Sequence, residues 1–238
     1  MAARFLFAWD WDWPAAEREF KRAIELNPNY PDAHCIYSQL LQSTGRSDAS
    51  IAEMRKAVEI DPDNPFFQEN LGVALSDAGR YDEAIAVFRK MFAGDPNSYM
   101  AQDGLWDTLF LKGQRDEALR QAKASFVSYG RPEIADAMKG EYRQAMRSGA
   151  EALIAARSQN FIGAVTIARF YAHAGEKDRV LEWLQRAANE RDTRMCYAVG
   201  DPLYASVRRD PRFREVITRV QTIAHSTDKN TDRAPSPR

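Results

Sequence analysis

The chain has few of the residues that most enzymes and metal sites depend on. It contains two cysteines and three histidines among 238 residues. Cys35 and Cys196 form no CxxC pair, so the sequence offers no disulfide framework and favours a reducing compartment. No stretch of 18 apolar residues occurs, so we expect no transmembrane helix and no membrane partner. The start of the chain is too short and too acidic for a signal peptide. These features predict a cytoplasmic protein.

Sequence motifs of the common enzyme classes are also missing. There is no GxGxxG, P-loop or GxSxG. His34 is expected in the core, and it points away from Cys35 on a helix, which argues against a Cys-His nucleophile. His173 is expected to be exposed and His225 to lie at a frayed end, neither with a partner at zinc-ligand spacing. We therefore predict no enzyme, no catalytic residue, no metal and no cofactor.

A repeat of 34 residues is the main feature that the sequence does have. Three series of positions recur at this interval: Ala16, Ser50, Ala84 and Ala118; Pro28, Pro62 and Pro96; Gly45, Gly79 and Gly113. A fixed period of this length predicts a helical solenoid. Each unit reads as two helices, because apolar residues recur at i, i+3 and i+4 on both sides of the glycine. The glycine ends the first helix and the proline closes the second.

The third unit, residues 65–98, resembles the tetratricopeptide family. The positions that carry the resemblance are Leu71, Gly72, Leu75, Gly79, Tyr81, Ala84, Phe88 and Pro96. The resemblance implies an all-α, right-handed α-solenoid of about six helix pairs. It also implies that the first helix of each unit lines the concave face. Small residues at Gly72 and Ala84 would allow the two helices of the unit to approach closely.

The repeats divide the chain into units and terminal segments. We expect units near 1–30, 31–64, 65–98, 99–130, 131–158 and 161–191, then capping helices over 201–224 and a disordered tail over 225–238. The fourth unit departs from the pattern, with Trp106 at a small-residue position and Ala122 at an aromatic position. Ala118 and Ala145 are only 27 apart, which predicts a short first helix in the fifth unit.

A narrower resemblance covers residues 10–34, 175–192 and 201–213. These segments look like the tetratricopeptide regions that follow bacterial winged-helix regulators, nucleotide cyclases and Ser/Thr kinases. The resemblance implies a bacterial regulatory or interaction module whose effector domain is not in this sequence. The first unit begins in mid-helix at Met1, as if earlier repeats or a domain had been lost.

The family resemblance implies a non-enzymatic scaffold that binds another protein or a peptide in its concave groove. The alternative is the detached sensory half of a signalling or transcription regulator. By family position, the groove would be lined by Asp32, Cys35, Gln39, Gln42, Phe66, Glu69, Asn70, Val73, Ser76, Asp77, Met100, Asp103, Asp107 and Phe110. This surface is acidic with apolar islands, so it suits a basic or amphipathic peptide, unless the acidic groups only keep the module soluble. Of the residues with which some family members clamp acidic chaperone tails, only Asn70 matches.

Charge and aromatic residues are unevenly distributed. Residues 1–119 have a balance of -8 and residues 120–238 a balance of +7. This asymmetry indicates a directional partner or head-to-tail association, or a solvated surface without a role. The basic end comprises Arg186, Arg191, Arg194, Arg208, Arg209, Arg212, Arg214 and Arg219. No recognition helix or aromatic RNA motif accompanies these arginines, so we do not expect a nucleic-acid partner. The aromatic cluster of Phe5, Phe7, Trp9, Trp11 and Trp13 favours self-association.

Overall fold

The computed structural model describes residues 12–96 and 98–219, apart from the side chain of Met100. The predicted tail over 225–238 and the aromatic cluster up to Trp11 lie outside this range. Within it, helices are the only regular secondary structure. The helices are α2 (Trp13–Leu26), α3 (Pro31–Ser43), α4 (Ser47–Ile60), α5 (Pro65–Asp77), α6 (Tyr81–Gly94), α7 (Tyr99–Leu111), α8 (Arg115–Ser128), α9 (Pro132–Ala137), α10 (Tyr142–Ala156), α11 (Ala164–Ala174), α12 (Lys177–Asn189), α13 (Met195–Ala198) and the 3-10 helix η1 (Pro202–Tyr204). A last helical stretch begins at residue 211.

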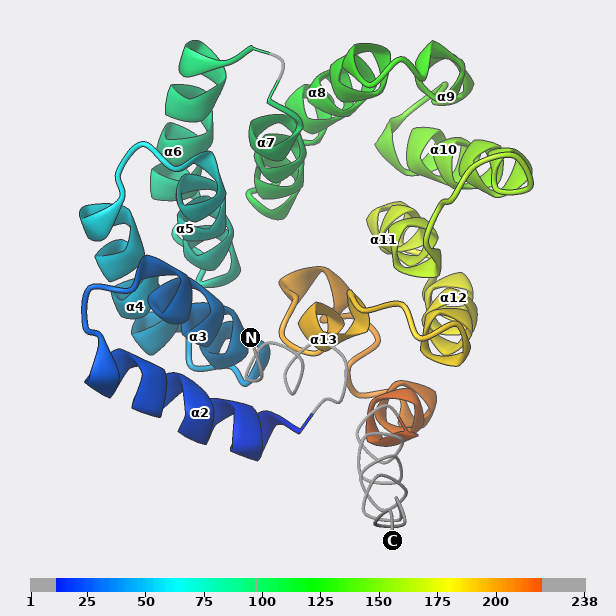
Figure 1. Ribbon diagram of the computed structural model, residues 1–238. Helices are drawn as coiled ribbons and strands as arrows, with labels where there is room; N and C mark the ends of the chain where they lie inside the picture. The colour runs from blue at the N-terminus through cyan, green and yellow to red at the C-terminus, as the bar shows by residue number, and fades with distance from the viewer. Residues whose placement is uncertain (1–11, 97, 220–238) are drawn as a thin grey trace, which may run out of the picture.

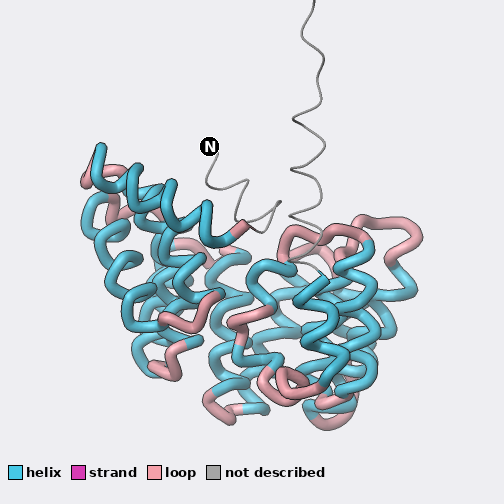
Figure 2. The backbone as a smooth tube through the Cα atoms, turned by 90° about the horizontal axis from the view of Figure 1, so that it is seen from below, coloured by secondary structure: helices cyan, strands magenta, loops and turns pink. Residues whose placement is uncertain are grey.

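The helices form antiparallel pairs that follow one another around a central space. The pairs are α3 with α4, α5 with α6, α7 with α8, α9 with α10, and α11 with α12. Figure 1 shows them arranged as a nearly closed ring, with α13 inside it. The view turned by 90° in Figure 2 shows neighbouring helices side by side, with most loops along the two rims. The predicted all-α solenoid is confirmed.

Glycine turns recur at the repeat period, and polar side chains cap some of the helices. Asp12 accepts a hydrogen bond from the Ala15 N–H at 3.0 Å, and Ser98 accepts one from the Ala101 N–H at 3.3 Å. Both satisfy backbone donors that have no partner within the helix. Gly79, after α5, has φ of +77°, a conformation that a side chain disfavours. The glycines that recur at 45, 79 and 113 therefore mark the turn between the two helices of units two, three and four.

Large and small residues interlock between the helices. Phe88 of α6 is fully buried, and its ring lies against Gly72 of α5 and Gly104 of α7. A Cβ atom added at Gly72 would lie 2.5 Å from the Phe88 ring. The small residue at Gly72 thus makes room for Phe88, and Gly104 does the same in the next unit. Trp106 stands at a position where the repeat pattern has a small residue. It is buried against Phe170 of α11, with ring centroids 5.8 Å apart.

The fifth unit tightens the curvature of the ring. The structure confirms a short first helix, since α9 has 6 residues where α3, α5 and α7 each have 13. Side chains of α7 therefore meet those of α11 directly, as the Trp106–Phe170 contact shows.

The segment after α12 turns into the ring. Tyr204 and Val207 are buried in the main core, and so are Phe213 and Val216 farther along. An aspartate stands ahead of each helical stretch here: Asp201 accepts from the Leu203 N–H at 2.8 Å, and Asp210 accepts from the Arg212 N–H at 2.9 Å. No pattern in the sequence indicates that α13 lies inside the ring, where it contacts α3.

Candidate binding site on the concave face

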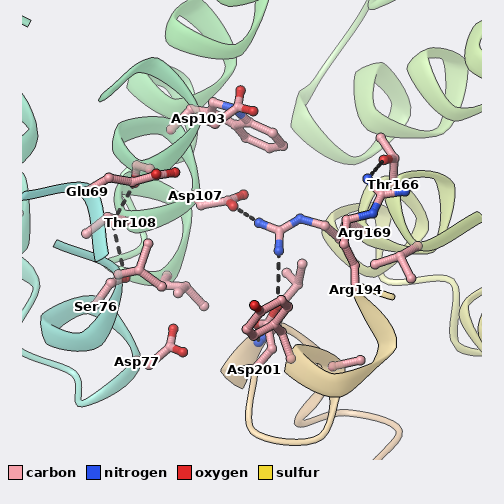
Figure 3. Close-up of a pocket in the computed structure, with 18 of the residues that line it drawn as sticks. Glu69, Ser76, Asp77, Asp103, Asp107, Thr108, Thr166, Arg169, Arg194 and Asp201 are labelled. Carbon is pink, nitrogen blue, oxygen red and sulfur yellow. Dashed lines mark hydrogen bonds and ion pairs between the residues drawn. The ribbon is translucent and has the colours of Figure 1, made fainter. Parts of the chain in front are cut away.

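A cavity of about 590 Å³ lies on the concave side of the ring. Its wall is built mainly from α3, α5, α7 and α11, the first helices of their units, together with the segment from Arg194 to Tyr204. Figure 3 shows polar side chains entering it from opposite walls. Five carboxylates and two guanidinium groups line it: Glu69, Asp77, Asp103, Asp107 and Asp201, with Arg169 and Arg194. The cavity is therefore predominantly acidic.

Most of the residues expected in the groove line this cavity. They are Gln39, Gln42, Phe66, Glu69, Asn70, Val73, Ser76, Asp77, Asp103 and Asp107. Asp32 is exposed and is not part of the lining, and the side chain of Met100 lies outside the described residues.

Two of the residues expected in the groove pack elsewhere. Cys35 is fully buried with Met54 and Phe67 in a small core cluster. Phe110 stacks on Tyr142 at 5.1 Å between ring centroids, since the short α9 leaves room for that contact.

Arg169 holds two carboxylates on opposite sides of the cavity. Its guanidinium group pairs with Asp107 of α7 and, at 3.1 Å, with Asp201 ahead of η1. Figure 3 shows this bridge between the two walls. Sequence reasoning missed Arg169, although a lone arginine in the apolar run of α11 was a visible signal. Because Asp107 is already paired with Arg169, its carboxylate is less available to a ligand than carboxylates of the cavity that form no ion pair.

The prediction that His173 is exposed and without a partner is wrong. Its side chain is fully buried, and Nε2 lies 2.8 Å from the Asp107 carboxylate. Nδ1 lies 2.9 Å from the Tyr142 hydroxyl. Burial and the nearby Arg169 guanidinium lower the pKa of His173 well below its usual range. A neutral ring that donates from Nε2 to Asp107 and accepts at Nδ1 from Tyr142 satisfies both contacts.

His34 confirms the expectation of a core histidine. It is buried, and its ring nitrogens contact Glu53 at 2.6 Å and the Pro28 carbonyl at 2.8 Å.

The α5–α7 side of the cavity has carboxylates that no basic residue neutralises. Asp103 is solvent-accessible, and its Oδ1 accepts from the Trp106 indole at 3.2 Å and the Tyr129 hydroxyl at 2.9 Å. Its Oδ2 has no hydrogen-bond partner among the described residues, and neither does the carboxylate of Glu69. Asp77 accepts from the Gln42 amide. In this part of the cavity, neutral donors orient some carboxylates and none of the three forms a salt bridge within the described chain.

This arrangement makes the carboxylates poor acids. Enclosure by the surrounding helices, reinforced by the negative charge of Asp103, raises the pKa of Glu69 to about 7. Enclosure likewise raises the pKa of Asp103, even though the group reaches solvent inside the cavity. It also raises the pKa of Asp77, with a further contribution from Asp201. A cation placed among these groups would be attracted more strongly as they lose their protons.

The unit-two side of the cavity is covered by the chain itself. The Gln39 amide donates to Asn70 at 2.7 Å, and its oxygen accepts from the Tyr197 hydroxyl at 3.2 Å. Gly200 packs so closely on α3 that a Cβ atom there would lie 2.5 Å from the Gln42 carbonyl oxygen. The segment containing α13 therefore blocks the groove over α3, and access from the unit-two side is restricted.

The described part of the chain has neither a metal-binding cluster nor a membrane-spanning helix, and several arginines at its basic end are paired. There, no three histidine, cysteine or acidic side chains come close enough to share a metal ion. The same residues contain no helix long and apolar enough to cross a bilayer. In the basic end, Arg186 pairs with Glu190, Arg194 with Asp192, and Arg212 with Asp178.

Family comparisons agree with the repeat pattern. Residues 12–65 match one family model and residues 53–86 another, and each is described as a tetratricopeptide repeat. No curated protein sequence matches the chain.

Three solved structures illustrate the similarity in fold. Yeast Tom70 is 15% identical with a TM-score of 0.52, over 86% of this chain and 46% of the Tom70 chain. PilW, a type IV pilus biogenesis factor, is 17% identical with a TM-score of 0.50, over 91% and 99% of the two chains. PilF of Pseudomonas aeruginosa is 19% identical with a TM-score of 0.48, over 87% and 90%. At these identities the likeness concerns the fold alone.

Proposed function

We propose that this chain, of which residues 12–86 match tetratricopeptide repeat models, is a protein-interaction scaffold whose concave cavity binds a basic or amphipathic segment of another protein. Helical repeat arrays commonly bind partners on their extended concave surfaces. Residues of units two, three, four and six and of the segment from Arg194 to Tyr204 line the cavity. Its volume is large enough for side chains of a partner.

The observation that carries this proposal is a group of carboxyl groups in the cavity that form no salt bridge and whose charged form a bound cation would stabilise. Glu69, Asp77 and Asp103 share one cavity and have no basic partner among the described residues, whereas Asp107 and Asp201 are bridged by Arg169. Apolar side chains such as Phe66 and Val73 lie beside them. A basic segment would supply the missing positive charge, and an amphipathic one would also cover the apolar surface.

A displayed peptide library selected on the full chain tests the proposal. We expect the enriched sequences to be basic, and their binding to weaken as salt rises, because accessible charges are screened over about 8 Å at physiological ionic strength. The variant with Glu69→Gln and Asp103→Asn should lose this binding. Asp107 is not used, since its replacement would also break the bridge to Arg169.

A matched control replaces exposed acids outside the cavity. Glu59→Gln with Asp63→Asn removes the same two charges from residues that are exposed and not part of the lining. Binding that survives in this control and disappears in the cavity variant supports the concave site. Peptides that bind both variants and the wild type equally would place the interaction on another surface.

A further inference from the structure

The chain already holds one guanidinium group in its own cavity. Arg169 lies between the carboxylates of Asp107 and Asp201, which come from opposite walls. A planar guanidinium has several donors and suits such carboxylate pairs. The Arg169 bridge thus shows that a guanidinium group fits between carboxylates of this cavity.

The wall formed by α5 and α7 offers the same chemistry without the cation. Glu69 of α5 and Asp103 of α7 project into the cavity from neighbouring helices (Figure 3). Trp106 and Tyr129 both donate to Oδ1 of Asp103, so the carboxylate is held in place while Oδ2 stays available. A carboxylate fixed in this way loses little conformational freedom when it binds a donor.

Aromatic and apolar surfaces flank these two carboxylates. Phe66 and Val73 come from α5, and Phe126 and Tyr129 from the end of α8; all four line the cavity. A guanidinium group stacks on aromatic rings and is more weakly hydrated than an ammonium group, so it suits a site of mixed acidic and aromatic character.

A second, independent feature of the cavity lacks a partner. Tyr204 is 1% exposed and lines the same cavity, and its hydroxyl has no hydrogen-bond partner in the described part of the chain. The charged neighbours of this hydroxyl include Asp201 and Arg169. Buried polar groups are normally satisfied, so the unpartnered hydroxyl indicates that the cavity is completed by a further group.

The closed wall restricts what can enter. Tyr197 and Gly200 lie against α3, so an extended backbone cannot run along the whole groove. A single long side chain needs only one opening. The cavity of about 590 Å³ is in the size range of small-ligand pockets.

We propose that the cavity is a receptor for one arginine side chain of the partner, whose guanidinium group binds between Glu69 and Asp103. This proposal rests on the proposed function and specifies the part of the partner that is recognised. A lysine ammonium group binds the same place less tightly, because it cannot contact both carboxylates in one plane or stack on the rings.

Capped amino acids test this recognition without a partner protein. The probes are N-acetyl-arginine methylamide, its lysine counterpart and its citrulline counterpart, which has nearly the shape of arginine without the charge. The indole N–H of Trp106 donates to Asp103, so its NMR resonance reports events at the site. We expect that resonance to shift with arginine, less with lysine, and not with citrulline.

The cavity variants define the site. Glu69→Gln or Asp103→Asn should weaken the arginine probe by about tenfold or more, as expected for the loss of a charge-assisted hydrogen bond. Glu59→Gln and Asp63→Asn should leave it unchanged. Free arginine should bind no more tightly than the capped form if the ligand is a side chain, because a site for a side chain has no groups that recognise the α-ammonium and α-carboxylate. Tighter binding of free arginine would identify a free amino acid as the ligand and overturn the partner side chain.

The outcomes separate this inference from the proposed function. One outcome is that peptide binding depends on Glu69 and Asp103 while capped arginine gives no response at the highest usable concentration. That result would refute the arginine receptor and leave the scaffold proposal intact. Equal shifts with arginine and citrulline would show that charge is not recognised. Arginine binding that the cavity variants do not change would move the site elsewhere on the protein.

Discussion

Phe88 illustrates how single residues fix the spacing of the array. Its ring has no exposed surface and lies between the Cα atoms of two glycines, Gly72 in its own unit and Gly104 in the next. Protein interiors are packed closely enough that one added methyl group is felt. The contact at Gly104 therefore sets how closely units three and four approach.

Gly104→Ala should destabilise the protein by about 1–3 kcal/mol, because the new methyl group would overlap the Phe88 ring, which cannot move into solvent. The measurement is chemical denaturation followed by circular dichroism. Gly94→Ala is the control: a Cβ atom there meets nothing within 4 Å, and alanine is the better helix former. Equal stability of the two variants would contradict the packing assigned to Phe88.

Glu69 gives the ligand-free protein a pH-dependent stability. Its pKa is about 7 in the folded protein against an ordinary value of 4.5. The folded state thus binds the proton more tightly than the unfolded state. The stability from this group is complete below about pH 4.5 and is lost as pH rises through about 7. Asp103 from α7 and Tyr129 at the end of α8 are the ionisable groups that interact with Glu69.

Between pH 5.5 and pH 8, the melting temperature of the Glu69→Gln variant should therefore fall less than that of the wild type. The measurement is thermal unfolding at a series of pH values, with Glu59→Gln as the control that should follow the wild type. If wild type and Glu69→Gln show identical pH profiles, the carboxyl of Glu69 is ionised in the folded protein as it is in the unfolded chain.

The predictable residues are those that the repeat itself places. Positions such as Ala84, Gly79 and Pro96 recur in phase, so one sequence suffices to assign them to a crossing, a turn and a boundary. Arg169 and His173 could not be placed in this way, since their partner Asp107 is 62 and 66 residues distant. No local pattern encodes a contact across two units, and it depends on the curvature of the whole array.

At the scale of elements, the short α9 has consequences that its sequence spacing only partly revealed. The 27-residue interval predicted the shortened helix, but not that α7, α10 and α11 would meet behind it. Tyr142 of α10, His173 of α11 and Asp107 of α7 form one chain of hydrogen bonds there. This chain ties three units together at the wall of the cavity.

Tyr142→Phe should cost about 1–3 kcal/mol, because it leaves Nδ1 of the buried His173 without a donor. Denaturant titration measures the loss, and NMR of the imidazole nitrogens checks whether the Nε2–H tautomer is retained. Tyr30→Phe is the matched control, since Tyr30 is largely exposed and its hydroxyl has no hydrogen-bond partner among the described residues. A loss no larger than that of the control would mean that the hydroxyl contributes nothing to this junction.

At the scale of the whole molecule, the array is closed by a contact between its two ends. Residues of the segment with α13 lie on α3, which precedes them by more than 150 residues, through the Tyr197–Gln39 hydrogen bond and the packing of Gly200. An ordinary solenoid contacts only its neighbours, and its stability is a sum over adjacent units. Here the terminal contact also encloses the cavity, so the ring shape and the candidate site depend on the same few residues.

Gly200→Ala should open this closure. The added methyl group would lie 2.5 Å from the Gln42 carbonyl oxygen and 3.0 Å from the Ser43 Cα, and both belong to the backbone of α3, which cannot rotate out of the way as a side chain can. The segment carrying α13 must then move away from α3. Small-angle X-ray scattering should show a larger radius of gyration than for the wild type or Gly94→Ala. Hydrogen exchange should speed up in residues 195–204 while α5 and α6 stay protected. A variant with unchanged scattering and unchanged exchange in that segment would show that the ring is not held closed at Gly200, and the cavity would then have to be treated as an open groove.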